Sequence, residues 1–374
     1  MKIKGTISNI KQKANRKISE KLIRSEKQGG KLFTGTRKHP HKKSKLKSEI
    51  KVIAPKFIDL YKTKNHFKTM DFMHKLEAAS FQATRSNSTL RICFRETMII
   101  SAAAGILLLS TIEIIAKKYP NIKVSISRPP NSKQNGEKGT VNVVHAVLER
   151  IGFYRALRLG PFKTKPFPHV DNWYIGSSTQ VDGQNLADAI KITKDLGVKT
   201  SELYRSGIEA ISNAVEHAYS DKVPTEKVFP LKKWWIFVGI IDARLVILVC
   251  DRGHGIPETL PYTQSANLLA EIKSYLTTFY KSKMSKIASD GDVAQIHAAT
   301  LVQETRTKLG HRGKGGKDIK SFVKANKDAR LIIFSNKGQY RFVKKNSRHV
   351  DLGYNDHHSI GGTIIEWSLP INVD

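Results

Sequence analysis

The sequence predicts an α+β protein with a basic N-terminal segment, a smaller α/β domain and a larger C-terminal domain. Three observations carry this prediction. Strand-like and helix-like apolar patterns alternate from about residue 71 onwards. Hydrophobic residues make up 40% of the 374 residues, which is enough for a sizeable core. The first 70 residues differ, because they hold 21 Lys and Arg against 4 Asp and Glu.

The basic segment, residues 1–70, carries about half of the excess charge. Its balance is +17, whereas the formal net charge of the whole chain is +32. Like charges repel and apolar side chains are few, so we expect the segment to be partly disordered. A positive field of this size attracts polyanions, of which DNA and RNA are the commonest. The segment is therefore either a nucleic-acid-binding arm or a solvated tail.

The smaller α/β domain is predicted to span residues 71–165. Its expected order is strand, helix, strand, helix, over residues 90–94, 98–117, 122–126 and 141–151. Pro129 and Pro130 stop the second strand, and Gly152 ends the second helix. A stretch rich in Pro and Gly, residues 159–172, indicates a linker to the C-terminal domain.

The apolar stretch from Thr97 to Ile112 must be weighed as a membrane span. It runs uncharged for 16 residues, whereas a spanning helix needs about 20, and Glu113 follows directly. We therefore expect a buried core helix and no transmembrane segment. No apolar signal-peptide region follows the Lys-rich start, and Cys93 and Cys250 lie far apart in apolar runs. These features favour a cytoplasmic protein with reduced, buried thiols.

The element order of residues 71–165, with a helix that ends in Ile151, Gly152 and Phe153, resembles the STAS domain of anti-anti-sigma factors. Antagonists of that family carry a phosphorylatable Ser in the first residues of a helix that follows a strand. Thr97 and Ser101 lie near the matching place. The alternative is that both are ordinary helix hydroxyls.

An amphipathic helix is predicted over residues 201–219, where apolar residues recur at helical spacing. Glu209, Asn213 and His217 follow one another at intervals of four, so they lie on one face. A carboxylate, an amide and an imidazole in one row are either a solvated polar stripe or part of a ligand site.

A strongly apolar strand, residues 246–250, delivers Asp251 to its end and then turns through Gly253 and Gly255. A carboxylate at a strand end can accept a hydrogen bond from an exocyclic amine. Glycine permits a positive φ and a close approach of backbone to a ligand. We therefore expect this turn to receive a flat base.

A second Gly-rich loop precedes an expected helix over residues 318–325. Backbone N–H groups at a helix start, together with cationic side chains, favour phosphate binding. The loop is not a Walker A motif, because no Gly-Lys pair is followed by Ser or Thr. Its candidate ligand residues are Arg312, Gly313, Lys314, Gly315 and Gly316. Further on, Thr363 stands at the mouth of a closing strand, directly after two glycines.

These four motifs, in this order, resemble the N box, G1 box, G2 box and final Thr of GHKL ATPases, the superfamily of gyrase, Hsp90, histidine kinases and MutL. The residues of these motifs are most similar to those of anti-sigma-factor serine kinases. The resemblance covers about residues 180–372 and assigns residues 166–374 to an ATP-binding domain. It implies a Bergerat-type α/β sandwich, with a mixed sheet and helices on one face. Residues 256–310 would be an enlarged lid or an inserted partner surface.

The resemblance also implies roles for single residues. Asn213 would bind the Mg²⁺ that bridges the phosphates, and Glu209 would be the general base or water-orienting group. Asp251 would bind the adenine amine, with Thr363 adding a hydroxyl beside it. His217 is a further candidate contact. Gly253 and Gly255 would let the base pack closely, and residues 312–316 would wrap the phosphates.

Several functions are compatible with such a domain. The strong positive charge favours a Mg-ATP-dependent conformational switch with slow ATP hydrolysis that associates with DNA or RNA. The alternative is a protein serine kinase or anti-sigma regulator that acts on the STAS-like domain. A sensor histidine kinase ranks low, because no His is followed by Asp or Glu. A binding module without turnover, a regulatory protein partner and a homodimer remain open.

Overall fold

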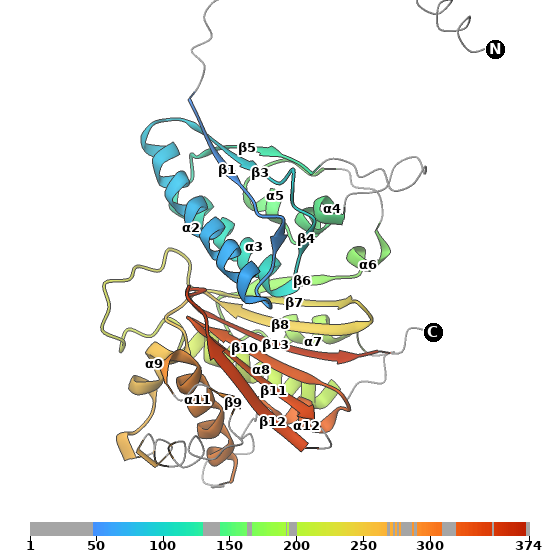
Figure 1. Ribbon diagram of the computed structural model, residues 1–374, viewed down its shortest axis with the longest axis vertical. Coiled ribbons are helices and arrows are strands. Elements are labelled where there is room, and N and C mark those ends of the chain that lie inside the picture. Colours follow the sequence, from blue (N-terminus) through green and yellow to red (C-terminus); the bar gives the residue numbers. More distant parts are fainter. Residues whose placement is uncertain are drawn as a thin grey trace, which may run out of the picture. The chain divides into compact units, whose positions relative to one another are not determined.

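The computed structural model has an α+β fold, as the sequence predicts (Figure 1). It describes residues 48–129, 143–162, 167–191, 193, 200–267, 270–271, 274, 277, 286–287, 290–308, 319–345 and 348–371. The chain divides into two units, residues 1–47 and residues 48–374. The first unit lies outside the described residues.

The larger of the two main sheets has eight strands in the order β6-β7-β8-β13-β10-β11-β12-β9. Neighbours pair antiparallel, except that β9 and β12 are parallel, so the sheet is mixed as expected. The strands in this order are Tyr174–Ser178, Trp234–Ile241, Arg244–Asp251, Thr363–Pro370, Arg330–Ser335, Gly338–Lys345, Arg348–Asn355 and Lys286–Ile287.

One face of this sheet is covered by the helices of the C-terminal half. They include α7 (Gly183–Lys191), α8 (Thr200–Glu216), α9 (Ile256–Thr263), α11 (Gly291–Lys308) and α12 (Ser321–Ala325). Helix α8 matches the predicted 201–219 helix, and α11 lies within the 256–310 region that is expected to be a lid or an inserted partner surface. Leu203, Ile211 and Phe322 pack there against alternate strand residues such as Ile247.

Helix α3 (Ala102–Lys118), from the predicted smaller domain, packs on the opposite face of the large sheet against β7 and β8. In β8, Leu245, Ile247 and Val249 belong to the core on the α8 side of the sheet. Val246, Leu248 and Cys250 belong to the core on the α3 side. A strand buried on both faces has no polar side to alternate with. This explains the unbroken apolar run that leads to Asp251.

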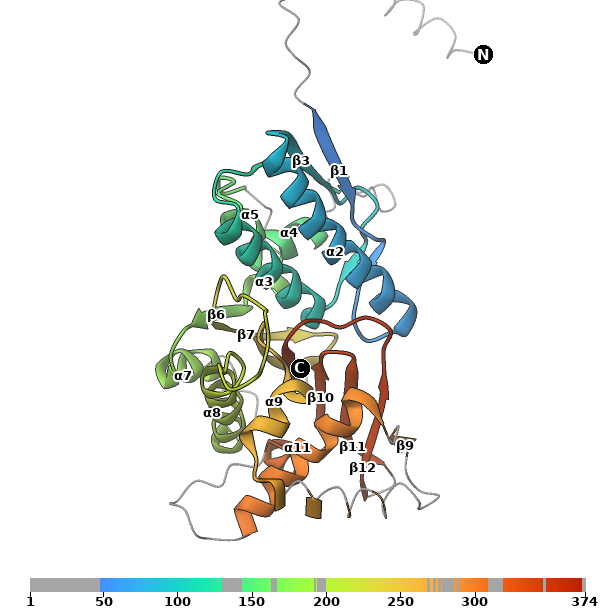
Figure 2. The same ribbon diagram turned by 90° about the vertical axis from the view of Figure 1, so that its left-hand side faces the viewer.

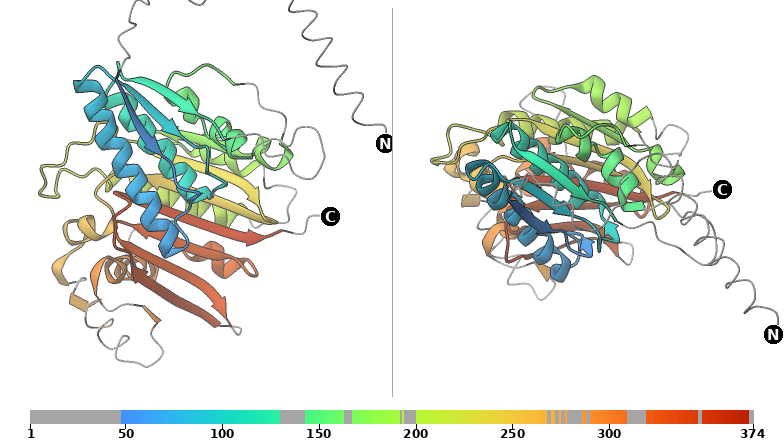
Figure 3. Two further views of the ribbon diagram at one scale, coloured as in Figure 1. Left: turned by 45° about the horizontal axis from the view of Figure 1, so that its top comes forward. Right: turned by 90° about the horizontal axis from the view of Figure 1, so that it is seen from above.

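The N-terminal part of the folded unit is a parallel sheet in the order β1-β3-β5, namely Glu49–Ile53, Thr89–Cys93 and Lys123–Ser127. Helix α2 (Thr63–Arg85) connects β1 to β3, and α3 lies between β3 and β5. Right-handed crossovers between neighbouring parallel strands leave both helices on one face. Figure 3 includes a view of this sheet from above.

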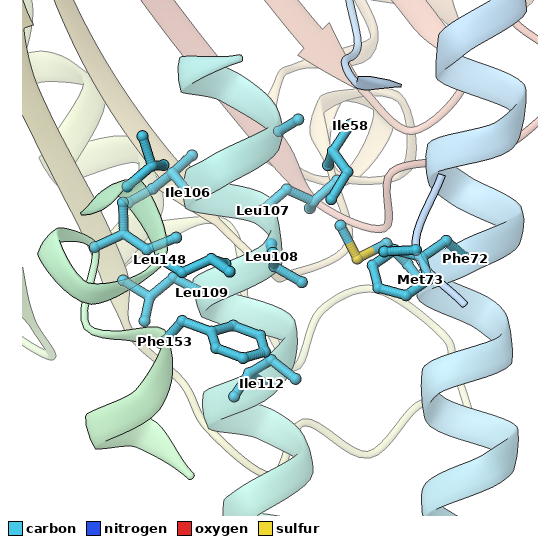
Figure 4. Packing of buried hydrophobic residues seen from close by; sticks show 14 of the residues in the cluster. Ile58, Phe72, Met73, Ile106, Leu107, Leu108, Leu109, Ile112, Leu148 and Phe153 are labelled. Carbon is cyan, nitrogen blue, oxygen red and sulfur yellow. The ribbon is translucent and has the colours of Figure 1, made fainter. Parts of the chain in front are cut away.

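Three smaller helices and a short strand pair complete this layer. The helices are α4 (Val143–Arg150), α5 (Phe153–Ala156) and α6 (Pro168–Asp171), and β2 (Phe57–Ile58) pairs in parallel with β4 (Ile99–Ile100). Gly152, at φ +84°, separates α4 from α5. In Figure 4, Leu109 of α3 lies beside Phe153 of α5, while Leu107 points toward Ile58 of β2. The predicted strands and helices of this region are thereby confirmed, with α3 starting four residues later than expected.

The predicted boundary at residue 70 is corrected by the structure, because the folded unit begins at Ser48. Strands β1 and β2 and the start of α2 all lie before residue 71. Lysines around β1 hide the apolar alternation of Ile50 and Val52 from a reading of composition. In the sheet, Ile50 pairs with Leu90 and Val52 pairs with Ile92. The boundary predicted at 165/166 lies outside the described residues.

The two predicted domains share one core, since a single cluster of buried residues joins Leu107 of α3 to Leu248 of β8. Polar contacts cross the same boundary. Glu113 of α3 lies 2.6 Å from the Lys233 ammonium and accepts a 3.0 Å hydrogen bond from Trp235 Nε1. Trp235 is fully buried. The N-terminal layer is thus an integral part of the folded unit.

Two further expectations are confirmed. The apolar stretch before Glu113 forms the buried helix α3, and no helix among the described residues is long and apolar enough to cross a membrane. Cys93 and Cys250 are both buried free thiols. Burial raises the pKa of the Cys250 thiol to about 12, which keeps it protonated.

Candidate functional site

Three polar residues stand side by side where the central strands of the large sheet end. The strand register pairs Asp251 of β8 with Thr363 of β13, and Thr363 with Ser335 of β10. All three are buried, Asp251 at 7% exposure and Thr363 at 5%. Asp251 and Thr363 were predicted site residues, and the sheet brings them together.

Asp251 is held as a hydrogen-bond acceptor. Its Oδ1 accepts a 2.9 Å bond from the Gly253 backbone N–H, and the backbone and hydroxyl of Thr363 also bond to it. Burial raises the pKa of the carboxyl to about 6, because an ion loses its hydration there, although these bonds and Arg252 oppose the shift. At pH 7 the group is mainly an anion that can accept from an amine.

Gly253 lets helix α8 meet this corner of the sheet. A Cβ at Gly253 would lie 2.0 Å from the carbonyl oxygen of Ala218, which is closer than any real contact. The same carbonyl accepts a 2.7 Å bond from the backbone N–H of His254, and the Arg252 N–H donates to the Tyr219 hydroxyl over 3.0 Å. The turn after β8 is thus docked on the C-terminal end of α8.

A second close approach occurs at Gly362, just before β13. Its φ is +132°, and a Cβ there would lie 2.4 Å from the carbonyl oxygen of Asp251. No other residue fits without moving the backbone of β8. Gly362 therefore explains why the closing strand begins with glycines, and it sets Thr363 beside Asp251.

The polar row on α8 lies on one flank of that helix. Glu209, Asn213 and His217 are half-buried, and they fall on the same side as Ser206 by helical spacing. The Ser206 hydroxyl lies 3.1 Å from the Ser321 hydroxyl of α12. The opposite flank packs on α7, where Gly207 meets Leu186. The predicted row therefore lies on the flank of α8 that meets α12 at Ser206, and not on the flank that packs on α7.

The predicted phosphate loop lies outside the described residues, so Arg312, Gly313, Lys314, Gly315 and Gly316 have no placement. The residues that follow it are firmly anchored. The carbonyl of Ile319 accepts a 2.9 Å bond from Trp367 Nε1, and the buried Lys320 ammonium donates to Asp351 over 3.2 Å. Since Ser321 then meets Ser206, the chain leaves the loop beside the polar flank of α8.

Asn336 is a site residue that sequence reasoning missed. It adopts a left-handed φ of +48° at the β10–β11 turn. Its Nδ2 donates to the His254 carbonyl over 2.8 Å, and its Oδ1 accepts from Ser359 over 3.3 Å and from the Gly362 N–H over 3.5 Å. It thus ties the turn after β8 to the start of β13. The available signal was Asn followed two residues later by Gly after an apolar run, which is typical of a turn.

No group of three or more His, Cys, Asp or Glu within the described ranges could hold a metal ion. A divalent cation at Asn213 would therefore need most of its oxygen ligands from a phosphate-bearing substrate or from water, as Mg²⁺ commonly does. A scan against protein-family models finds no match, and a search of curated proteins finds no significantly similar sequence.

Proposed function

We propose that the protein binds Mg-ATP in the manner of a GHKL ATPase and acts as a conformational switch with slow ATP hydrolysis. The pairing of Asp251 with Thr363, at a turn docked on α8, is the observation that carries this proposal. A buried anionic acceptor beside a hydroxyl suits the exocyclic amine of adenine. The polar flank of α8, which runs up to this turn, supplies groups for the phosphates.

Each candidate residue takes a role that its chemistry allows. Asp251 and Thr363 bind the adenine, and Gly253 and Gly255 form the tight turn beside it, where the missing side chains make room for Ala218 and Asn336. Asn213 offers an oxygen to Mg²⁺, which when bound neutralises charge that develops on the phosphates. His217 and residues 312–316 would contact the phosphates.

Hydrolysis would proceed through Glu209. Its carboxylate accepts a proton from the attacking water as the water oxygen bonds to the γ-phosphorus. The bond from that phosphorus to the bridging oxygen breaks, and ADP leaves with the electron pair. The carboxylic acid then returns its proton to solvent.

The contacts of residues 356–362 support a switch. At one end of this segment, His66 of α2 lies 3.8 Å from Asp356, and the Phe67 ring lies 4.9 Å from the His358 ring. At the other end, Gly362 rests on Asp251. A change at the nucleotide would therefore be transmitted to the N-terminal layer through a short, packed segment.

The charge of the first unit supports association with DNA or RNA. Residues 1–47 contain 16 Lys and Arg against 2 Asp and Glu, a balance of +14. Nucleotide-dependent contact between this basic segment and a nucleic acid is the output that we propose for the switch.

The kinase alternative requires an acceptor hydroxyl that a nucleotide can reach. Thr97 is 3% exposed and donates to the Pro55 carbonyl over 3.1 Å. The Ser101 hydroxyl is likewise buried, with no hydrogen bond to any described part of the chain. This burial supports the switch over a kinase that acts on its own N-terminal layer.

Nucleotide binding and turnover with Mg²⁺ test the proposal. Asp251→Asn and Asn213→Ala should weaken ATP binding at least about tenfold, since each loses a charge or ligand that the ground state uses. Glu209→Ala should bind ATP but not hydrolyse it. Glu216→Ala, an exposed carboxylate on the same helix, is the matched control. Absence of ATP binding by the wild type would refute the proposal.

A further inference from the structure

Helix α2 exposes an ordered row of aromatic rings beside a row of cations. Phe67 and Phe81 are each 50% exposed, and His74 lies midway between them, so the rings repeat every seven residues. Two helical turns separate successive rings, and all three lie on one side of the helix. In Figure 2, this helix lies toward the viewer. The α2 stripe consists of Lys64, Phe67, Lys68, His74, Lys75, Phe81 and Arg85.

The stripe is distinct from the buried side of the same helix. Phe72, Met73 and Leu76 face the core, each at 2% exposure or less. A single exposed aromatic needs no explanation, but a periodic row flanked by charge differs from scattered surface residues. Four of the stripe residues are cationic. The same helix carries two acidic residues, Asp71, which is paired with Lys75 at 2.6 Å, and the exposed Glu77.

The rings are partly held by neighbours. Phe67 and His74 both contact the His358 ring, at 4.9 and 5.9 Å between centroids. The Arg85 guanidinium stands 5.5 Å above the Phe81 ring. Rings that are already supported lose less conformational entropy when a ligand covers their open faces.

We propose that the α2 stripe binds single-stranded nucleic acid, with bases stacked on the rings and phosphates beside Lys64, Lys68 and Lys75. Charge complementarity identifies a polyanion, since residues 48–374 alone carry 48 Lys and Arg against 30 Asp and Glu. Exposed rings identify unpaired bases, because a duplex hides the faces of its bases. The strongly basic residues 1–47 join the folded unit at β1, whose strand contacts α2.

The position of the stripe links it to the candidate nucleotide site. His358, which touches Phe67 and His74, belongs to the 356–362 segment that carries Gly362 to Asp251. A single-stranded nucleic acid that covers these rings should therefore change the affinity for ATP, and ATP should change the affinity for the nucleic acid by the same factor. This coupling rests on the proposed function, whereas binding of the nucleic acid does not.

Fluorescence anisotropy of a labelled oligodeoxythymidine with the full chain, without nucleotide, tests the binding. The Phe67→Ala/Phe81→Ala variant should weaken binding about tenfold or more, because base stacking on aromatics contributes strongly. Lys68→Glu/Lys75→Glu should lower the slope of log affinity against log salt by about 1.4, at about 0.7 per contact on single strands. Tyr262→Ala, on α9 and 47% exposed, and Lys344→Glu/Lys345→Glu, on β11, are matched controls and should bind like wild type.

Two outcomes would overturn the inference. Stripe variants that keep a native melting temperature and bind the oligonucleotide within twofold of wild type would exclude the stripe. Loss of self-association without loss of oligonucleotide binding would assign it to a second copy of the chain. ATP titration of the same proteins separates the two proposals. If the wild type binds the oligonucleotide but no ATP, this inference stands and the proposed function is refuted.

Discussion

The two main sheets of the folded unit differ in how many of their faces are buried. The eight-stranded sheet has helices on both faces near its centre, and Leu248 and Ile247 of β8 are each fully buried on opposite sides. The three-stranded sheet buries Val52, Leu90 and Ile92 on one face and carries charged residues such as Lys51 on the other. Burial on both faces removes water from the carboxyl groups of these strands and thereby shifts their pKa values.

This difference between the sheets separates carboxyl groups with shifted pKa values from carboxyl groups that solvent screens. Burial raises the pKa of Asp251 to about 6 and of Glu366, on the neighbouring strand, to about 7. Arg91 of the smaller sheet instead forms a partly exposed ion pair with Glu49, at 2.6 Å. Reactive or ligand-binding carboxylates belong to the first environment, and solvated binding surfaces belong to the second.

The largest expected effect on stability is at Trp235, which is buried between the N-terminal layer and the large sheet. Trp235→Ala should lower the free energy of unfolding by about 3–5 kcal/mol, because a cavity forms and Glu113 loses a donor. Chemical denaturation measures it. Ile53→Ala, on the open face of β1 and 57% exposed, is the control and should change stability by less than about 0.5 kcal/mol. Equal effects would contradict the contrast between the sheets.

The next effect follows from the buried charge of Asp251. A carboxyl whose pKa rises from about 3.9 when unfolded to about 6 when folded destabilises the fold increasingly as the pH rises above about 4, and fully above about pH 6. As the pH falls from 7 to 4, the folded state takes up a proton before the unfolded state does, so stability rises. Asp251→Asn should therefore be about 2–3 kcal/mol more stable than wild type at pH 8, and the difference should vanish near pH 4.

Thermal unfolding at several pH values measures this, with Glu49→Gln on the smaller sheet as the matched control. A difference between Asp251→Asn and wild type that does not depend on pH would show that the carboxylate is not buried as described. The same variant should lose ATP binding, so stability and ligand binding would change in opposite directions.

A somewhat smaller effect is expected at Gly253, where α8 meets the sheet. Gly253→Ala should cost about 1–3 kcal/mol, because the added Cβ meets the Ala218 carbonyl and the backbone must shift. Gly160→Ala is the control, since nothing lies within 4 Å of a Cβ there. Unfolding midpoints and ATP affinity measure the change, and an unaltered Gly253→Ala protein would argue against the docking of α8 on the turn.

The smallest effect belongs to the ion pair of the smaller sheet. Arg91→Ala should cost no more than about 0.5–1 kcal/mol, because solvent screens a pair whose Arg side chain is 42% exposed. The cost should fall further in high salt. A larger loss that ignores salt would mean that this face is buried in solution.

Local pattern predicted most of the elements but not their partners. The apolar run before Asp251 gave strand β8, and the spacing of Leu203 and Ile211 gave α8, because each pattern reports burial of a single element. The covering of β8 by α3 depends on contacts between segments far apart in the chain. The lysines before residue 71 conceal β1, whose pairing with β3 overrides its charged composition.

The candidate site was predictable to a similar degree. Asp251, Gly253 and Thr363 stood out through the turn glycines and the order of motifs, and their adjacency required the strand register. Asn336 and Ser335 did not stand out, because an amide and a hydroxyl in a turn have many local uses. Their role follows from hydrogen bonds to residues that lie more than twenty positions away in sequence.

The order of strands has a consequence for biosynthesis. Strand β13 is the last described strand of the chain, yet it is inserted between β8 and β10 at the middle of the sheet. While the ribosome is still making this strand, β8 and β10 have unpaired central edges, which invite pairing with other chains. A premature stop codon before residue 363 should therefore yield insoluble protein and not a shortened, working one.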